Sequence, residues 1–196
     1  MRQAGIGTRI ALLVGAGLLL AAAMPAAETD GTMSLSVPDV VLRNQDGDRV
    51  RVWSELIRGN VVVMNFVFTN CTTICSPMGA NFGELQSRLG RDVKLISVSI
   101  DPGTDTPARL KRWSGQFHAG PSWTLLTGDR QEVERLLKAL GVYTGNRFSH
   151  APILLVGDGS NGRWLRGNGL AAPGEVLSMI RRVRLATAAP AARSAR

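Results

Sequence analysis

The chain has 196 residues, 44% of them hydrophobic, and a formal net charge of +8 at pH 7. This length suits about one domain with a single buried core. Two of the 23 basic residues precede residue 28 and five follow residue 180. Residues 28–180 therefore contain 16 basic residues and all 15 acidic residues. Because the central region is nearly neutral, we expect no face that binds nucleic acid.

Residues 1–27 have the pattern of a secretory signal peptide. Arg2 and Arg9 precede an uncharged apolar stretch, and residues 21–23 offer an Ala-x-Ala cleavage site. The stretch is also just long enough for a membrane anchor, and both interpretations stay open. In either case the basic residues on its N-terminal side place the rest of the chain outside the cytoplasm. We expect a linker at residues 28–36, one domain at 37–185 and a disordered Ala-rich tail at 186–196.

The first half of the domain predicts a hairpin, a buried strand and a helix. Residues 40–42 and 50–52 flank an Asp-Gly pair, which is typical of a β-hairpin, and a short helical piece follows at 53–57. Residues 61–68 form a nearly continuous apolar run, which indicates a central strand covered on both faces. After a loop that holds both cysteines, Ser76 can cap a helix and Pro77 suits its first position. The apolar side chains of this helix are Met78, Phe82, Leu85 and Leu89.

The second half alternates strands and helices. A buried strand at residues 93–100 and a loop at 101–107 lead to a helix that extends to Phe117. A short strand at 123–126 is followed by a helix with a capping box formed by Asp129 and Glu132. Residues 152–156 and 163–166 predict a closing hairpin, and the last helix has Val176, Ile180 and Val183 on one face. This order predicts an α/β sandwich with a mixed sheet of about five strands.

Cys71 and Cys75 are the only cysteines, and they directly follow the first central strand. Open α/β sheets place their sites at this end of the strands, and the N-terminus of the following helix favours thiolate over thiol. Thioredoxins carry a cysteine pair in the same context but with two residues between them. The three residues here leave room for a metal ion between the sulfurs. A third ligand is then needed, and the candidates are His118 and His150.

The two histidines differ in their surroundings. His150 immediately precedes a predicted strand and could share the sheet edge with the cysteines, whereas the dipole of the preceding helix explains His118 adequately. Two thiolates and an imidazole suit Cu(I), and with an added ligand Cu(II). Zinc at a structural site would need four ligands, and no further Cys or His remains. Met78 could add a thioether, but its place on an apolar helix face favours core packing.

Three interpretations need no metal. In a thiol–disulfide oxidoreductase one cysteine of the pair would attack a partner and the other would resolve the mixed disulfide. A peroxidase would use a lone activated thiolate, which the second cysteine argues against. A purely structural disulfide is disfavoured because closing so short a loop removes little conformational entropy from the unfolded chain and so adds little stability.

The motifs FTNCTTICSPM and SVSIDPGTDTPARL, followed by a lone histidine before an apolar strand, together resemble the Sco/SenC family. The resemblance covers residues 36–183 and implies a thioredoxin-like domain: three layers, a mixed central sheet, flanking helices and terminal hairpins. It also implies that Cys71, Cys75 and His150 bind copper. It further implies a protein on the periplasmic side of the membrane. This protein would deliver copper to the binuclear copper site of cytochrome c oxidase subunit II, or would reduce the cysteines of that site. A separate thiol reductant would then keep its own two cysteines reduced.

The sequence departs from the family pattern at two positions. Many members have Pro directly after the second cysteine, where this chain has Ser76. Many also have an acidic residue directly before the histidine, where this chain has Ser149. Asp101 is a candidate to replace that carboxylate and orient the imidazole if its loop folds over the site. Turn and cap formation is an alternative role for Asp101 and Asp105.

Overall fold

The structure is a computed structural model that describes residues 31–146 and 149–185. The expected signal peptide or anchor, the first residues of the expected linker and the Ala-rich tail lie outside these described residues. Among the helices that are described, none is both long and apolar enough to span a bilayer.

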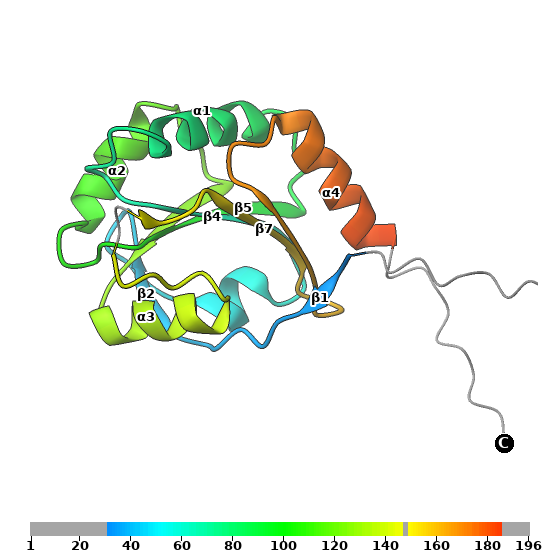
Figure 1. The fold of residues 1–196 in the computed structure, drawn as a ribbon, viewed down its shortest axis with the longest axis horizontal. Coiled ribbons are helices and arrows are strands. Elements are labelled where there is room, and N and C mark those ends of the chain that lie inside the picture. Colours follow the sequence, from blue (N-terminus) through cyan, green and yellow to red (C-terminus); the bar gives the residue numbers. More distant parts are fainter. Residues whose placement is uncertain (1–30, 147–148, 186–196) are drawn as a thin grey trace, which may run out of the picture.

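The centre of the protein is an eight-stranded mixed sheet with the order β1-β8-β7-β4-β5-β6-β2-β3 (Figure 1). Its strands are β1 (Met33–Ser34), β2 (Val41–Asn44), β3 (Arg49–Arg51), β4 (Val61–Val67), β5 (Val93–Ser99), β6 (Trp123–Thr127), β7 (Ile153–Asp158) and β8 (Arg163–Asn168). Strands β4, β5 and β6 are parallel, whereas β7 runs antiparallel to β4. The predicted count of about five strands was too low, because both hairpins extend the central sheet and β1, in the segment expected to be a linker, pairs with β8.

Helices cover both faces of the sheet (Figure 1). One face carries α1 (Cys75–Gln86), α2 (Pro107–Gly115) and α4 (Pro173–Leu185), and the other carries α3 (Arg130–Ala139) and a π-helical segment, η1 (Val52–Ile57). Successive side chains of β4 enter opposite cores: Val63 packs with the first group of helices and Met64 with the second. The predicted three-layer, thioredoxin-like α/β fold is therefore confirmed.

Two of the predicted helix starts are confirmed and one is wrong. Asp129 caps α3 by accepting hydrogen bonds from the Gln131 and Glu132 amides, and Thr106 caps α2 ahead of Pro107. Helix α1 instead begins at Cys75, one residue before the expected cap Ser76, and its N-cap, Ile74, makes no side-chain capping bond. The sulfur of Cys71 lies 3.4 Å from the Cys75 amide nitrogen and accepts its hydrogen bond, so a cysteine takes the place of the usual hydroxyl cap.

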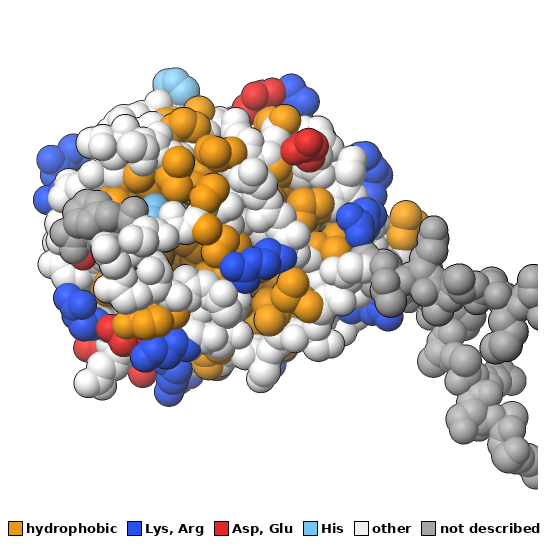
Figure 2. Space-filling view, in the orientation of Figure 1, with side chains coloured by type: hydrophobic (Ala, Val, Ile, Leu, Met, Phe, Trp, Pro, Cys, Tyr) orange, Lys and Arg blue, Asp and Glu red, His pale blue; other side chains and the backbone are white. Residues whose placement is uncertain are grey.

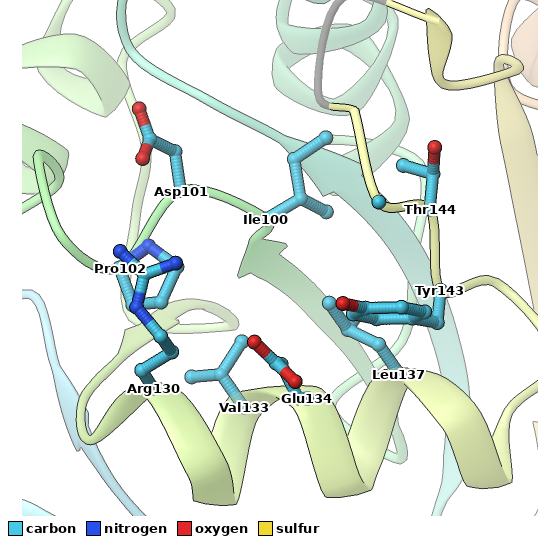
Figure 3. Close-up of a pocket in the computed structure, with 10 residues that line it drawn as sticks. Ile100, Asp101, Pro102, Arg130, Val133, Glu134, Leu137, Tyr143 and Thr144 are labelled. Carbon is cyan, nitrogen blue, oxygen red and sulfur yellow. The ribbon is translucent and has the colours of Figure 1, made fainter.

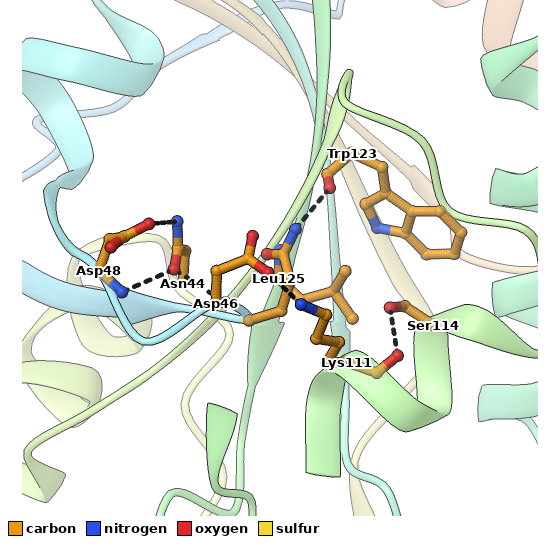
Figure 4. A network of polar contacts seen from close by, with 8 residues as sticks. Asn44, Asp46, Asp48, Lys111, Ser114, Trp123 and Leu125 are labelled. Atoms are coloured by element: carbon orange, nitrogen blue, oxygen red, sulfur yellow. Dashed lines mark hydrogen bonds and ion pairs between the residues drawn. The ribbon is translucent and has the colours of Figure 1, made fainter. Parts of the chain in front are cut away.

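The turn of the predicted β2–β3 hairpin joins β6 and α2 through polar contacts (Figure 4). Asn44 Oδ1 accepts hydrogen bonds from the Asp46 and Asp48 amides, which closes the turn. The Gln45 side chain accepts from the Leu125 amide at 2.9 Å, and Lys111 on α2 donates to Asp46 at 2.7 Å. These contacts fix the position of α2 against the edge of the sheet.

Candidate metal centre

The cysteine loop (residues 68–74) links β4 to α1. All seven residues of β4 are buried, and the chain turns directly after it because the Cys71 amide donates to the Phe68 carbonyl at 3.1 Å. Cys71 is partly exposed on the loop, whereas Cys75 is fully buried as the first residue of α1. Both cysteines are free thiols in this structure. The pair therefore presents one accessible sulfur and one sulfur that faces the protein interior.

Asp105 anchors the start of the cysteine loop. Its carboxylate accepts hydrogen bonds from the Thr69 amide at 3.2 Å, from Thr69 Oγ1 at 2.6 Å and from Ser99 Oγ at 2.7 Å. Arg109 donates from the other side to Thr69 Oγ1 at 3.3 Å and to Asn70 Oδ1 at 2.6 Å. Asp105 is thus neither a cap nor an exposed turn residue, because Thr106 caps α2 and Asp105 is only 1% exposed.

The two thiols have opposite electrostatic surroundings. Burial alone would raise the pKa of Cys71, but hydrogen bonds from the Cys75 thiol and from the Thr73 and Cys75 amides outweigh it and lower that pKa. Burial, followed by the Cys71 interaction, raises the pKa of Cys75 to about 12. Cys71 is therefore the sulfur that becomes a thiolate first.

The antiparallel pairing of β7 with β4 brings His150 to the cysteines. Leu154 on β7 lies opposite Asn65 on β4, so the residues that precede β7 lie beside the end of β4. His150 Nε2 is 4.0 Å from Cys75 Sγ, and the His150 ring packs edge-on against Phe68 with 5.5 Å between centroids. The predicted placement of His150 at the sheet edge of the cysteine loop agrees with this geometry.

Cys71 and His150 line the same cavity, which has a volume of about 360 Å³. Its other lining residues are Phe68, Asn70, Thr72, Thr73, Ile74 and Pro152. Within the described ranges, no three His, Cys, Asp or Glu side chains already form a metal-binding group. A metal bonds sulfur at about 2.3 Å and imidazole nitrogen at about 2.0 Å, so one ion can reach both Cys75 Sγ and His150 Nε2 at their present separation. The donor set of thiols and imidazole fits a soft ion such as copper.

The remaining candidate residues lie elsewhere. Met78 is fully buried in the core with Phe82 and Leu85, as its place on the helix predicts. His118 does not line the cysteine cavity; it follows α2 with a φ of 56°, and its carbonyl accepts a hydrogen bond from Gln86. Asp101 lines a different pocket, formed with residues of α3 and with Tyr143 (Figure 3). The role of Asp101 as a residue that orients His150 stays a prediction.

Sequence reasoning did not find Thr69, Arg109 or the anchoring role of Asp105. The sequence feature that could have drawn attention to Asp105 is its position directly before a Thr-Pro helix start. Asp in that context, however, usually forms a turn or a cap. Its actual contacts depend on how β4 and β5 align, since Val67 lies opposite Ser99. A register of this kind cannot be deduced from local spacing.

The family model SCO1/SenC matches residues 32–155. The chain belongs to the SCO1/SenC family. A curated relative, the SCO1 protein homolog of Bacillus subtilis, is 38% identical over 107 residues, which are 52% of this chain and 54% of that protein. The match thus spans about half the length of that relative.

Solved structures of the family share the fold. The structure of BsSco, a member of the Sco family of cytochrome c oxidase assembly proteins, has a TM-score of 0.67 and 28% identity over 78% of this chain and 95% of that one. ScoI of Bradyrhizobium japonicum, solved with copper bound, has a TM-score of 0.62 and 24% identity over 76% of this chain and 99% of that one. The fold is thus shared with a cytochrome c oxidase assembly protein and with a protein solved with copper bound.

The asymmetry of the thiols predicts selective alkylation. In the reduced protein, iodoacetamide should modify Cys71 well before Cys75. The Cys71 rate should rise with pH through a midpoint below the ordinary 9.0, whereas Cys75 stays protonated up to about 12. In Cys75→Ala the midpoint for Cys71 should move upward, because the thiol donor that stabilises its thiolate is lost. Peptide mass spectrometry at a series of pH values measures both rates; preferential labelling of Cys75 would contradict the assignment.

Asp105→Ala should lower the free energy of unfolding by about 1–3 kcal/mol, because the Thr69 and Ser99 donors lose their buried acceptor. It should also change the alkylation rate of Cys71, since the start of the cysteine loop is released. Urea denaturation measures the first effect. The control is Asp92→Ala, which removes an exposed ion pair with Arg184 worth less than about 1 kcal/mol. Equal losses in both variants would refute the anchoring role.

Proposed function

We propose that this protein is a copper chaperone that binds copper through Cys71, Cys75 and His150 and delivers it to the binuclear copper site of cytochrome c oxidase subunit II. The observation that carries the proposal is the 4.0 Å separation of Cys75 Sγ and His150 Nε2, residues 75 positions apart in the chain. Disulfide chemistry alone does not need an imidazole there. Membership in the SCO1/SenC family and the soft donor set support the same conclusion.

The site can bind copper only in its reduced form, because a Cys71–Cys75 disulfide leaves no thiolate for the metal. The proposed partners are therefore two: a copper protein that receives the ion and a thiol reductant that restores the pair. Of the two proposed sulfur ligands, Cys71 is partly exposed and Cys75 is buried. The buried sulfur can hold the metal in an oxidising compartment, while the exposed sulfur presents it to a partner.

The electrostatics of the pair favour a second candidate, a thiol–disulfide oxidoreductase that reduces cysteines of a copper-site protein. The Cys71 thiolate would attack a partner disulfide, forming a mixed disulfide and releasing one partner thiolate. Cys75 would then lose its proton and attack Cys71, which releases the second partner thiol and leaves a Cys71–Cys75 disulfide. Two electrons pass to the partner. The lowered pKa of Cys71 suits the first attack. Because the pKa of Cys75 is raised, the second step needs a base, and the partner thiolate released in the first step can take the Cys75 proton.

A Cu(I) titration of the reduced full chain against a competing chelator tests the copper site. Wild type should bind one tight equivalent, and Cys71→Ser and Cys75→Ser should lose stoichiometric binding because each removes a thiolate ligand. His150→Ala should weaken binding by at least about tenfold. The matched control is His118→Ala, which removes the other histidine and should bind as wild type.

Wild-type affinity in either serine variant would refute the three-ligand site. Binding that is weak and indifferent to His150 would instead identify the pair as a redox dithiol. The reduction potential of the pair and its mixed disulfides with partners would then decide the second candidate.

We also propose that residues 1–27 carry the domain (residues 37–185) to the periplasmic side of the membrane, as a cleaved signal or as an anchor. The basic, apolar and small-residue order of this segment supports the proposal. Fused to alkaline phosphatase, which needs an oxidising compartment for its disulfides, residues 1–36 should give an active enzyme, and deletion of residues 10–20 should abolish activity. Activity that survives this deletion would contradict the proposal, and membrane fractionation separates anchor from cleaved signal.

A further inference from the structure

A second hollow lies beside the cysteine loop. It has a volume of about 280 Å³ and is lined by Thr69, Arg109, Arg112, Trp113 and Gln116. We name it the α2 groove. One wall is Thr69, two residues before Cys71, and the other is the side of α2 that carries Arg109, Arg112 and Trp113. Lys and Arg side chains also lie at several separate places on the face of the molecule drawn in Figure 2.

The floor of the α2 groove is aromatic and rigid. Trp113 is 5% exposed, and its ring packs edge-on against Phe117 at 4.9 Å and Trp123 at 6.4 Å between centroids. The Trp113 ring is therefore held in one orientation beneath the polar and charged lining residues, and it would lose little side-chain entropy when a segment binds above it.

The lining of the α2 groove holds two arginines and no carboxylate. Arg109 donates to two neutral acceptors, Thr69 Oγ1 and Asn70 Oδ1, so its charge is retained. Arg112 is exposed and makes no side-chain hydrogen bond or ion pair within the part of the chain that the structure describes. Lys111, by contrast, is paired with Asp46. The nearby carboxylate of Asp105 is buried, and its oxygens accept from Thr69 and Ser99.

We propose that the α2 groove is the docking site for an acidic segment of the protein that exchanges copper with this one. The proposal rests on the copper function proposed above. Arginine pairs with carboxylates through two parallel hydrogen bonds, and the exposed guanidinium of Arg112 offers such donors. Arg109 adds its positive charge beside Arg112, although its Nε and one Nη already donate to Thr69 and Asn70. Arg109 also contacts Asn70, the neighbour of Cys71, so a segment in the groove would hold its protein beside the exposed sulfur.

The test uses the full chain without copper and a fluorescein-labelled peptide of alternating Glu and Ala, eight residues long, as probe. Fluorescence anisotropy measures its dissociation constant. Arg112→Glu should weaken binding about tenfold, because a favourable pair becomes a repulsive one. Arg58→Glu is the matched control: it makes the same charge change at an exposed arginine that follows η1, on the opposite face of the sheet. This variant should bind within about twofold of wild type, and added salt should weaken binding to wild type.

Unchanged affinity in Arg112→Glu would overturn the proposal. Equal weakening in Arg58→Glu would also overturn it, because the peptide would then respond only to net charge. A Cu(I) titration of the same variants separates this proposal from the copper function, since Arg112 contacts none of the proposed ligands and its variant should keep wild-type copper affinity. Failure of wild type to bind copper would refute the proposed function, whereas the peptide result concerns the groove alone.

Discussion

Asp105 joins the ends of three parallel strands through its carboxylate and its backbone carbonyl. The carboxylate accepts hydrogen bonds from Ser99, the last residue of β5, and from Thr69, which follows β4. The Asp105 carbonyl accepts from Thr127, the last residue of β6, at 2.6 Å. Since a buried acceptor that loses its donors costs free energy, these contacts constrain β4, β5 and β6 to end together. The cysteine loop starts from this fixed point, and its geometry depends on it.

The topology of the sheet then places His150 beside the cysteine pair. A parallel strand beside β4 would begin at the opposite edge, far from the cysteines. Because β7 is antiparallel to β4, its first residues lie at the end where the cysteine loop begins. His150 reaches Cys75 for this reason, although 74 residues separate the two in sequence. The local pair and the distant imidazole are thus two outcomes of one mixed sheet.

Features with local signals could be predicted from the sequence. The apolar run of β4, the cap of α3 and the buried face of α4 all follow from residue patterns of a few positions. At α2 the cap is Thr106 and not Asp105, which the pattern had suggested. The cysteine pair and His150 could be placed at one sheet edge from the order of strands and helices. The start of α1 could not be predicted in this way. The sulfur of Cys71, in the preceding loop, caps the helix in place of the Ser76 hydroxyl that the sequence pattern suggested. The role of Asp105 and the eight-stranded count depend on strand register and edge pairing, which single-sequence patterns do not specify.

The unequal exposure of the two sulfurs imposes an order on ligand exchange. Cys75 has no accessible surface, whereas Cys71 lies on the open side of the loop. An incoming thiol therefore meets Cys71 first, and an ion held by the pair would lose that bond before the bond to Cys75. The first step of any exchange takes place at the protein surface and needs no opening of the core. A small chelator and a large protein face the same first step, so selectivity between them has to arise from the surface around Cys71 rather than from depth of burial.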